Sequence, residues 1–88
     1  MRYRILIESR AERELKALPP EIITRIDRKL QALAGNPRPR GTQKLRGREG
    51  EGYRVRVGDY RILYQIDDAQ KVVRVYRIKH RREAYRRR

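Results

Sequence analysis

The chain of 88 residues contains no cysteine, a single histidine and a single serine, and only 11 of its residues are acidic. Without cysteine it can form no disulfide, thiolate metal site or cysteine nucleophile, and a reducing cytosol is compatible with it. One histidine, His80, cannot make the spaced histidine pair of a zinc site. The acidic residues are scattered, whereas metal-dependent nucleases need them clustered. We therefore expect no metal and no cofactor.

Long apolar runs are missing as well. No run approaches the roughly 18 apolar residues of a membrane span, so we expect no membrane partner and a cytoplasmic location. The first ten residues, MRYRILIESR, contain only a short apolar run and are not expected to be a signal peptide. Although 41% of the residues are charged, the apolar ones recur at regular spacing. This pattern predicts one small folded domain over residues 1–88.

Positive charge is in excess. The chain has 20 arginines and 5 lysines, a net charge of +14 and a pI near 11.2. Such a field favours a polyanion as partner, which means nucleic acid, an acidic protein or a membrane surface. Guanidinium groups suit bidentate phosphate contacts and stacking on bases.

The N-terminal part predicts a strand over residues 2–8 followed by two helices. Ser9 is expected to cap the first helix, with Glu12 completing a capping box. The proline pair at residues 19–20 separates the helices, and residues 35–37 stop the second. Apolar residues at helical spacing mark the buried faces: Ala11, Leu15 and Leu18, then Ile23, Ile26, Leu30 and Leu33.

The stretch YRVRVGDYRILYQI, residues 53–66, predicts a β-hairpin. Gly58 and Asp59 suit a two-residue turn, which pairs Val57 with Tyr60 and so fixes the register. One face is then apolar and belongs to the core: Tyr53, Val55, Val57, Tyr60, Ile62, Tyr64 and Ile66.

The other face of this hairpin carries Arg54, Arg56 and Arg61. The register places Arg56 directly across from Arg61, and like charges in that position destabilise a sheet by roughly 0.2–1 kcal/mol. Three guanidinium groups together suggest a phosphate site. The alternative is a solvated basic face in a very basic protein.

Residues 38–52 are expected to form a loop with a short extended piece near Lys44 and Leu45. Its basic side chains either track phosphates beside the hairpin or are simply solvated; they are Arg38, Arg40, Lys44, Arg46 and Arg48. After the hairpin, Asp67 and Asp68 are interpreted as turn residues, not as metal ligands.

Residues 72–79 predict the last strand. Its alternation is imperfect, and a bulge near Tyr76 would reconcile it. The predicted order is therefore β-α-α-β-β-β. The fold class is α+β, with a small, mostly antiparallel sheet covered on one face by the helix pair and a short C-terminal helical tail.

RNA cleavage without a metal is the chemistry that these residues leave open, because RNA carries its own nucleophile in the 2′-OH. Arginines can stabilise the charged phosphate intermediate. His80 ends the last strand and could project over the arginine face as an acid–base group; alternatively it is a surface histidine. Tyr85 could stack on a base or donate a proton, or pack the last helical turn.

Two segments, LRGREGEGYRVRVGDYRILYQI (residues 45–66) and HRREAY (residues 80–85), carry a resemblance to a known family. With the helix pair before them, they resemble the RelE/ParE superfamily of type II toxin–antitoxin toxins, and more closely its RelE branch. The resemblance covers essentially the whole chain. It implies a RelE-like fold, a ribosome-dependent endoribonuclease that cleaves mRNA in the 30S A site, and a cognate antitoxin through which the toxin mainly oligomerises.

The resemblance also implies roles for particular residues. Arg61 matches the phosphate-stabilising arginine of the family, and Arg54 and Arg56 match basic strand positions that are often lysines. The remaining matches lie in the tail: His80 with the histidine of YoeB-like relatives, Tyr85 with a base-stacking tyrosine, and Arg81 with a basic residue. Lys79 and Arg82 are also expected to contact RNA.

The chain departs from the family pattern in its acid–base groups. A guanidinium cannot act as a base near neutral pH, so Arg54 and Arg56 cannot replace a catalytic lysine. Proton transfer then depends on His80 or on groups of the ribosome. The catalytic carboxylate of YoeB-like members has only Glu49 and Glu51 as weak counterparts.

Two alternatives remain. A ParE-like toxin would share the fold and inhibit DNA gyrase without enzymatic activity, and the retained Arg61, His80 and Tyr85 argue against it. A basic RNA-binding module without activity is the other.

Overall fold

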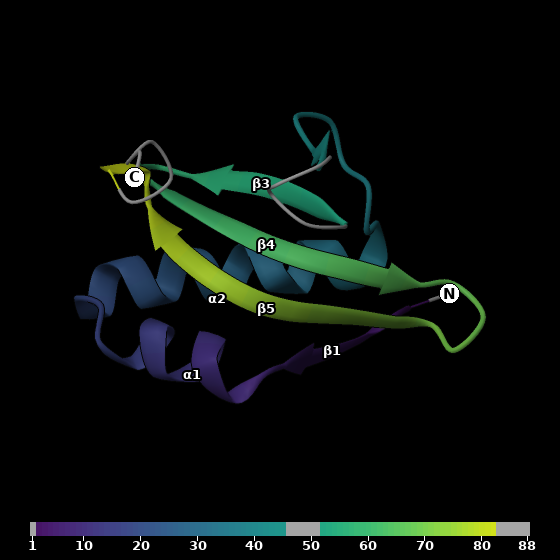
Figure 1. Ribbon diagram of the computed structural model, residues 1–88, viewed down its shortest axis with the longest axis horizontal. Coiled ribbons are helices and arrows are strands. Elements are labelled where there is room, and N and C mark those ends of the chain that lie inside the picture. Colours follow the sequence, from purple (N-terminus) through teal and green to yellow (C-terminus); the bar gives the residue numbers. More distant parts are fainter. Residues whose placement is uncertain (1, 46–51, 83–88) are drawn as a thin grey trace.

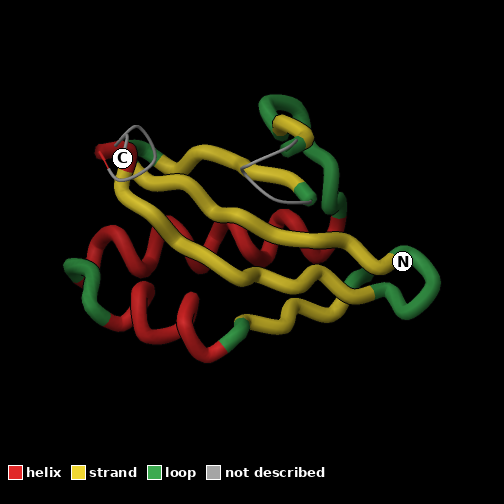
Figure 2. Tube along the Cα trace, viewed as in Figure 1, coloured by secondary structure: helices red, strands yellow, loops and turns green. Residues whose placement is uncertain are grey.

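The computed structural model describes residues 2–45 and 52–82, in which two helices pack on one face of a five-stranded sheet (Figures 1 and 2). In chain order the elements are β1 (Arg4–Ile7), α1 (Ser9–Lys16), α2 (Pro20–Gly35), β2 (Gln43–Lys44), β3 (Tyr53–Val57), β4 (Tyr60–Asp67) and β5 (Val72–His80). The strand order is β1-β5-β4-β3-β2. Among the described strands β1 and β5 pair in parallel and the other neighbours pair antiparallel, so the predicted α+β class and mostly antiparallel sheet are confirmed.

The hairpin of β3 and β4 has the predicted register. Val57 pairs with Tyr60 and Arg56 with Arg61, around a turn in which Gly58 takes a φ of 57°. A positive φ at the first turn residue is available to glycine without steric strain, and it matches the twist of the flanking strands. The alternation therefore places the core residues on the helix side and the arginines on the opposite face.

A β-bulge in β5 explains its irregular alternation. Leu63 pairs with Arg77, but the next residue of β4, Tyr64, pairs with Val75. Tyr76 is thus an extra residue on β5, at the position where the sequence suggested a bulge. The shift lets Val75 and Ile78 both face the helices, where both are buried.

The core lies between the helices and the sheet, and Tyr64 is at its centre. Its side chain is fully buried, and its hydroxyl donates to the carbonyl oxygen of Pro37 at 2.7 Å. Burial raises the pKa of this phenol. Because the acceptor lies in the segment after α2, this hydrogen bond anchors the segment that leads to β2. Core residues around Tyr64 are Ala11, Leu15, Ile26, Leu30, Leu33, Val55, Val57, Ile62, Val73, Val75 and Ile78.

The predicted cap of α1 is wrong. The helix begins at Ser9 itself, Glu8 occupies the cap position, and no side chain caps the helix there. Ser9 is one residue too late because the backbone of Glu8 is still extended, with ψ of 157°. The helix also ends at Lys16, before Leu18, although Leu18 still packs against the core.

The first helix protects the edge of β5 beyond the end of β1. Glu14 accepts hydrogen bonds from the backbone N–H of Ile78 at 2.7 Å and from Nε of Arg77 at 2.8 Å. An unpaired strand edge invites pairing with another chain. Glu14 therefore occupies a donor that β1, which ends opposite Val75, does not reach.

Gly52, directly before β3, offers a test of the close approach of this backbone to β4. Its φ is +109°, its carbonyl accepts a hydrogen bond from Leu45, and a Cβ there would overlap the carbonyl oxygen of Tyr64. We expect Gly52→Ala to lower the free energy of unfolding by about 3 kcal/mol, measured by urea denaturation. Gly41 is the matched control, because its φ is +92° but nothing lies within 4 Å of a Cβ. Gly41→Ala should cost about 1 kcal/mol; equal losses would exclude the steric contact as the cause.

Candidate nucleic-acid interface

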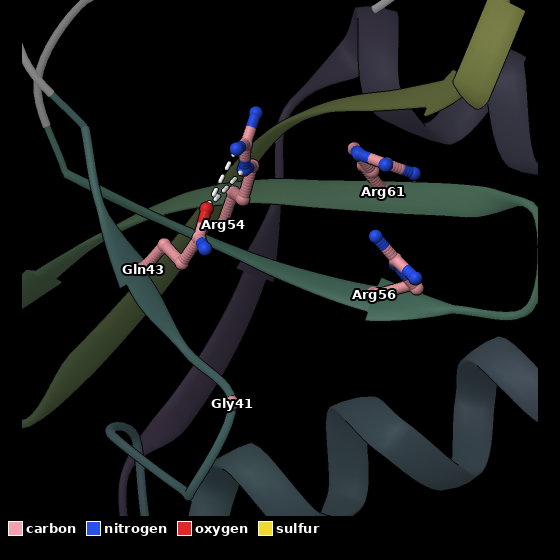
Figure 3. A pocket seen from close by; sticks show the side chains of 5 residues that line it. All are labelled: Gly41, Gln43, Arg54, Arg56 and Arg61. Atoms are coloured by element: carbon pink, nitrogen blue, oxygen red, sulfur yellow. Dashed lines mark hydrogen bonds between the residues drawn. The ribbon is translucent and has the colours of Figure 1, made fainter.

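Three arginines from the hairpin line one hollow on the open face of the sheet. Arg54 and Arg56 come from β3 and Arg61 from β4, and with Gly41 and Gln43 they enclose about 440 Å³ (Figure 3). Figure 3 shows the three side chains standing on the same face of the two strands. The pairing of the strands therefore creates a basic concavity that fits an anionic group.

Arg61 is the buried member of this cluster. Its relative exposure is 4%, whereas Arg56 is exposed. Its cross-strand neighbours are Arg56 on β3 and Lys79 on β5, so three cationic residues lie side by side across the sheet. A guanidinium held in a largely buried position is already oriented when an anion arrives, which makes its interaction stronger than that of a mobile surface charge.

Gln43 orients Arg54. The side-chain oxygen of Gln43 accepts from Nε of Arg54 at 3.1 Å and from Nη2 at 2.6 Å (Figure 3). Gln43 lies on β2 directly opposite Arg54 in the register. Sequence reasoning missed this role, because the pairing of a two-residue strand cannot be read from periodicity.

Arg81 joins the cluster through the hairpin turn. Its backbone N–H donates to the carbonyl oxygen of Asp59 at 2.6 Å, and its guanidinium lies 3.7 Å from the Asp59 carboxylate. A smaller hollow of about 180 Å³ is lined by Arg56, Gly58, Asp59, Arg61 and Arg81. Asp59 is therefore a carboxylate of the site, although its sequence context predicted only a turn residue.

His80 does not share the face of the arginines, and the expectation that it projects over them is wrong. In the pairing of β4 with β5 it lies opposite Tyr60, whereas the partner of Arg61 is Lys79. Its ring packs edge-on against Tyr60 at 5.0 Å, and its Nδ1 accepts from the backbone N–H of Arg82 at 3.1 Å. The bulge at Tyr76 exchanges the faces of the residues after it, so that Lys79, and not His80, shares the face of Arg61.

The predicted loop contacts are dispersed. Lys44 is exposed on β2, opposite Tyr53, and Arg40 and Arg82 are exposed. Arg38 is held in an ion pair with Asp68. The other predicted site residues lie outside the described residues: Arg46, Arg48, Glu49, Glu51 and Tyr85.

Comparison with known proteins decides the family. A family model described as the ParE toxin of the type II toxin–antitoxin system parDE matches residues 5–85. The chain belongs to the RelE/ParE superfamily of type II toxins. It is 34% identical to toxin RelG of Mycobacterium tuberculosis over 88 residues, covering 99% of this chain and 100% of RelG.

Solved structures of the superfamily share the fold. The toxin–antitoxin complex RelBE2 of M. tuberculosis contains a chain that matches with a TM-score of 0.82 and 32% identity, over 92% of this toxin and 100% of that chain. A chain of the archaeal RelE–RelB complex from Pyrococcus horikoshii matches with a TM-score of 0.81 and 32% identity, over 92% and 97%. The predicted RelE-like fold is thus confirmed.

The described ranges, residues 2–45 and 52–82 of the toxin, contain neither a metal-ligand cluster nor a membrane-spanning helix. Within these ranges no three histidine or acidic side chains come together as metal ligands. No helix there is both long and apolar enough to cross a membrane.

A polar clamp holds the segment after α2 in this toxin. Asp68 accepts from Nη2 of Arg38 at 2.8 Å and from the Tyr3 hydroxyl at 2.6 Å, and Nε of Arg38 donates to the Tyr53 hydroxyl at 3.2 Å. The bond to Arg38, and then that to Tyr3, lowers the pKa of Asp68 to about 2. The same carboxylate raises the pKa of Tyr3. Asp67 makes an Asx-type turn by accepting from the backbone N–H of Gln70, as expected.

This clamp predicts an acid-dependent loss of stability. A depressed carboxyl pKa stabilises the fold above the unfolded-state value near 3.9, and this contribution disappears as the pH falls from about 4 towards 2. NMR titration should place the Asp68 carboxyl at about 2, and Arg38→Ala should raise its pKa towards 3.9. Arg40→Ala serves as the control and should leave the titration unchanged. A normal carboxyl pKa in the wild type would contradict the clamp.

Proposed function

We propose that this toxin is a ribosome-dependent endoribonuclease that cleaves mRNA in the 30S A site. The observation that carries the proposal is the buried Arg61 guanidinium, flanked by Arg56 and Lys79 and lining a hollow together with Arg54. Such a concavity fits a phosphodiester group. The relatives' names, RelG for one curated toxin and RelE in the solved complexes, support the same assignment.

The proposed reaction uses the nucleophile of the substrate. The 2′-oxygen loses its proton and attacks the adjacent phosphorus, the bond to the 5′-oxygen breaks, and that oxygen takes up a proton. The products are a 2′,3′-cyclic phosphate and a 5′-OH. Negative charge grows on the non-bridging oxygens along the way, and guanidinium forks pair with such oxygens through two hydrogen bonds.

Each arginine has a distinct place in this scheme. Arg61 binds the scissile phosphate from its buried position, and Arg56 approaches from the neighbouring strand. Arg54, oriented by Gln43, and Arg81, held at Asp59, close the two ends of the cluster. Since no guanidinium accepts a proton near neutral pH, these residues contribute electrostatic stabilisation, and the ribosome supplies proton acceptors. Neither the proposed reaction nor the arginine cluster calls for a metal or a cofactor.

A cognate antitoxin is the second proposed partner. The similar structures from M. tuberculosis and P. horikoshii are complexes of a toxin with its antitoxin. By analogy this toxin is silenced in the cytoplasm by an antitoxin, through which it also mainly oligomerises.

Gyrase inhibition is the competing function, because the matching family model is described as a ParE toxin. A gyrase inhibitor that acts through protein contacts has no need of a hollow lined by oriented arginines. Induction that causes DNA damage while mRNA stays intact would favour ParE-like activity, and primer extension on mRNA after induction would reveal cleavage.

Loss of the arginine cluster should abolish cleavage without abolishing the fold. We expect Arg56→Ala and Arg61→Ala each to reduce mRNA cleavage on ribosomes by roughly 10²–10³-fold, the usual effect of removing a group that stabilises transition-state charge. Arg13→Ala, on the exposed surface of α1, is the control for lost charge. Because Arg61 is buried, thermal melting must accompany the assay, and the exposed Arg56 is the safer variant. Full cleavage by a folded Arg56→Ala variant would refute the site.

His80 should matter less than the arginines. Its ring packs on Tyr60 and its Nδ1 is already bonded to the backbone of Arg82. We therefore expect His80→Gln to lower the cleavage rate by less than about tenfold, below the 10²–10⁴-fold typical of a general acid–base group. A larger loss in His80→Gln, together with a change in the shape of the pH–rate profile relative to the wild type, would show that His80 carries a proton in the reaction.

A further inference from the structure

A second basic hollow lies beside the hairpin, between β3 and α2. It has a volume of about 420 Å³ and is formed where α2 lies against β3. Arg25, Arg28 and Lys29 contribute from the helix, and Arg56, Val57 and Gly58 from the hairpin. We refer to this hollow as the α2 groove.

The basic residues of α2 form one stripe. Arg25, Arg28 and Lys29 have the spacing i, i+3 and i+4, which places them on the same face of the helix. Asp27 falls outside this stripe, and Glu21, one turn earlier, is not part of the groove wall. Among the residues that the structure describes, no ion pair or side-chain hydrogen bond occupies these three cationic groups.

The groove is continuous with the arginine cluster. The guanidinium of Arg25 lies against the hairpin turn, since a Cβ on Gly58 would come within 3.2 Å of its nitrogens. Arg56 lines the α2 groove and also both hollows of the cluster. A bound polyanion could therefore follow basic side chains without a gap, from Arg61 over Arg56 to α2.

We propose that the α2 groove binds the phosphate backbone of the RNA strand flanking the phosphate held by Arg61. This inference rests on the proposed function for the identity of the polymer. A protein segment is the weaker fit, because stable protein interfaces need an apolar centre. The groove wall offers only Ala32 and Val57 for that purpose. Phosphates need charge and hydrogen-bond donors, which Arg25, Arg28 and Lys29 supply.

The test measures binding, not cleavage, so that it stays informative if the toxin proves not to be a nuclease. The probe is single-stranded RNA of about 12 nucleotides, within the range that single-strand sites occupy, fully 2′-O-methylated to prevent 2′-OH attack. A probe of about three nucleotides is shorter than the roughly 4–16 nucleotides of single-strand sites and serves as the probe for the arginine cluster alone. The key variant is Arg25→Ala/Arg28→Ala/Lys29→Ala, and the matched control is Arg10→Ala/Arg13→Ala/Lys16→Ala on α1, which removes the same charge.

The α2 variant should lose long-probe affinity roughly tenfold to a hundredfold, and the slope of log K against log salt should fall by about 2, from three lost phosphate contacts. Affinity for the short probe should stay within about threefold, and the α1 variant should change both values far less. Because alanine favours helix, the variant should fold, which thermal melting verifies. The pair Arg28→Glu and Arg13→Glu repeats the comparison with one substitution each.

Two results would overturn the proposal. Equal losses of RNA affinity in the α1 and α2 variants would mean that the groove acts only through the net charge of the toxin. A variant that keeps its RNA affinity but loses binding of a polyglutamate peptide would assign the groove to an acidic protein. Absence of mRNA cleavage by the wild type, with the binding pattern intact, would instead refute the nuclease proposal and leave the groove standing.

Discussion

The two-residue turn at Gly58 and Asp59 is the constraint on which the rest of the structure depends. Because side chains alternate along a strand, a turn longer by one residue would exchange the two faces of one strand relative to its partner. The turn thus determines that Val55 and Ile62 meet the helices while Arg56 and Arg61 meet each other. It also supplies both the carbonyl and the carboxylate that hold Arg81.

The sheet tolerates the arginine pair because its other face is strongly stabilising. Opposed like charges cost roughly 0.2–1 kcal/mol, whereas each large apolar side chain that is fully buried contributes roughly 1.5–3 kcal/mol. Val55, Ile62 and Tyr64 lie behind the arginines with at most 3% exposure. Tyr64 also anchors the Pro37 segment and so helps to set the course of the chain that carries Gln43 to Arg54. The core thus orients a surface that would not assemble alone.

Local patterns made the hairpin, its register, the second helix and the arginine face predictable from the sequence, because each depends on neighbours a few residues apart. Features that depend on distant segments were not predictable. The α1 cap was misplaced by one residue. The predicted face of His80 was wrong because the bulge at Tyr76, which the sequence suggested but did not fix, exchanges the two faces for the remainder of β5. Asp59, Gln43 and the α2 groove required tertiary contacts that no periodicity encodes.

Among the described residues, most ion pairs involve α1 or β5. On α1, β1 and β5 the acidic side chains of Glu8, Glu12 and Glu14 each pair with a basic residue. Near the hairpin turn Arg81 makes a long contact with Asp59, and at the opposite end of the hairpin Arg38 pairs with Asp68. The basic residues that line the two hollows form one continuous surface from Arg61 over Arg56 to α2. The field of such a surface orients an approaching polyanion before contact. Net charge alone would speed binding at any surface, so the placement of the basic residues, as much as their number, determines where a polyanion would dock.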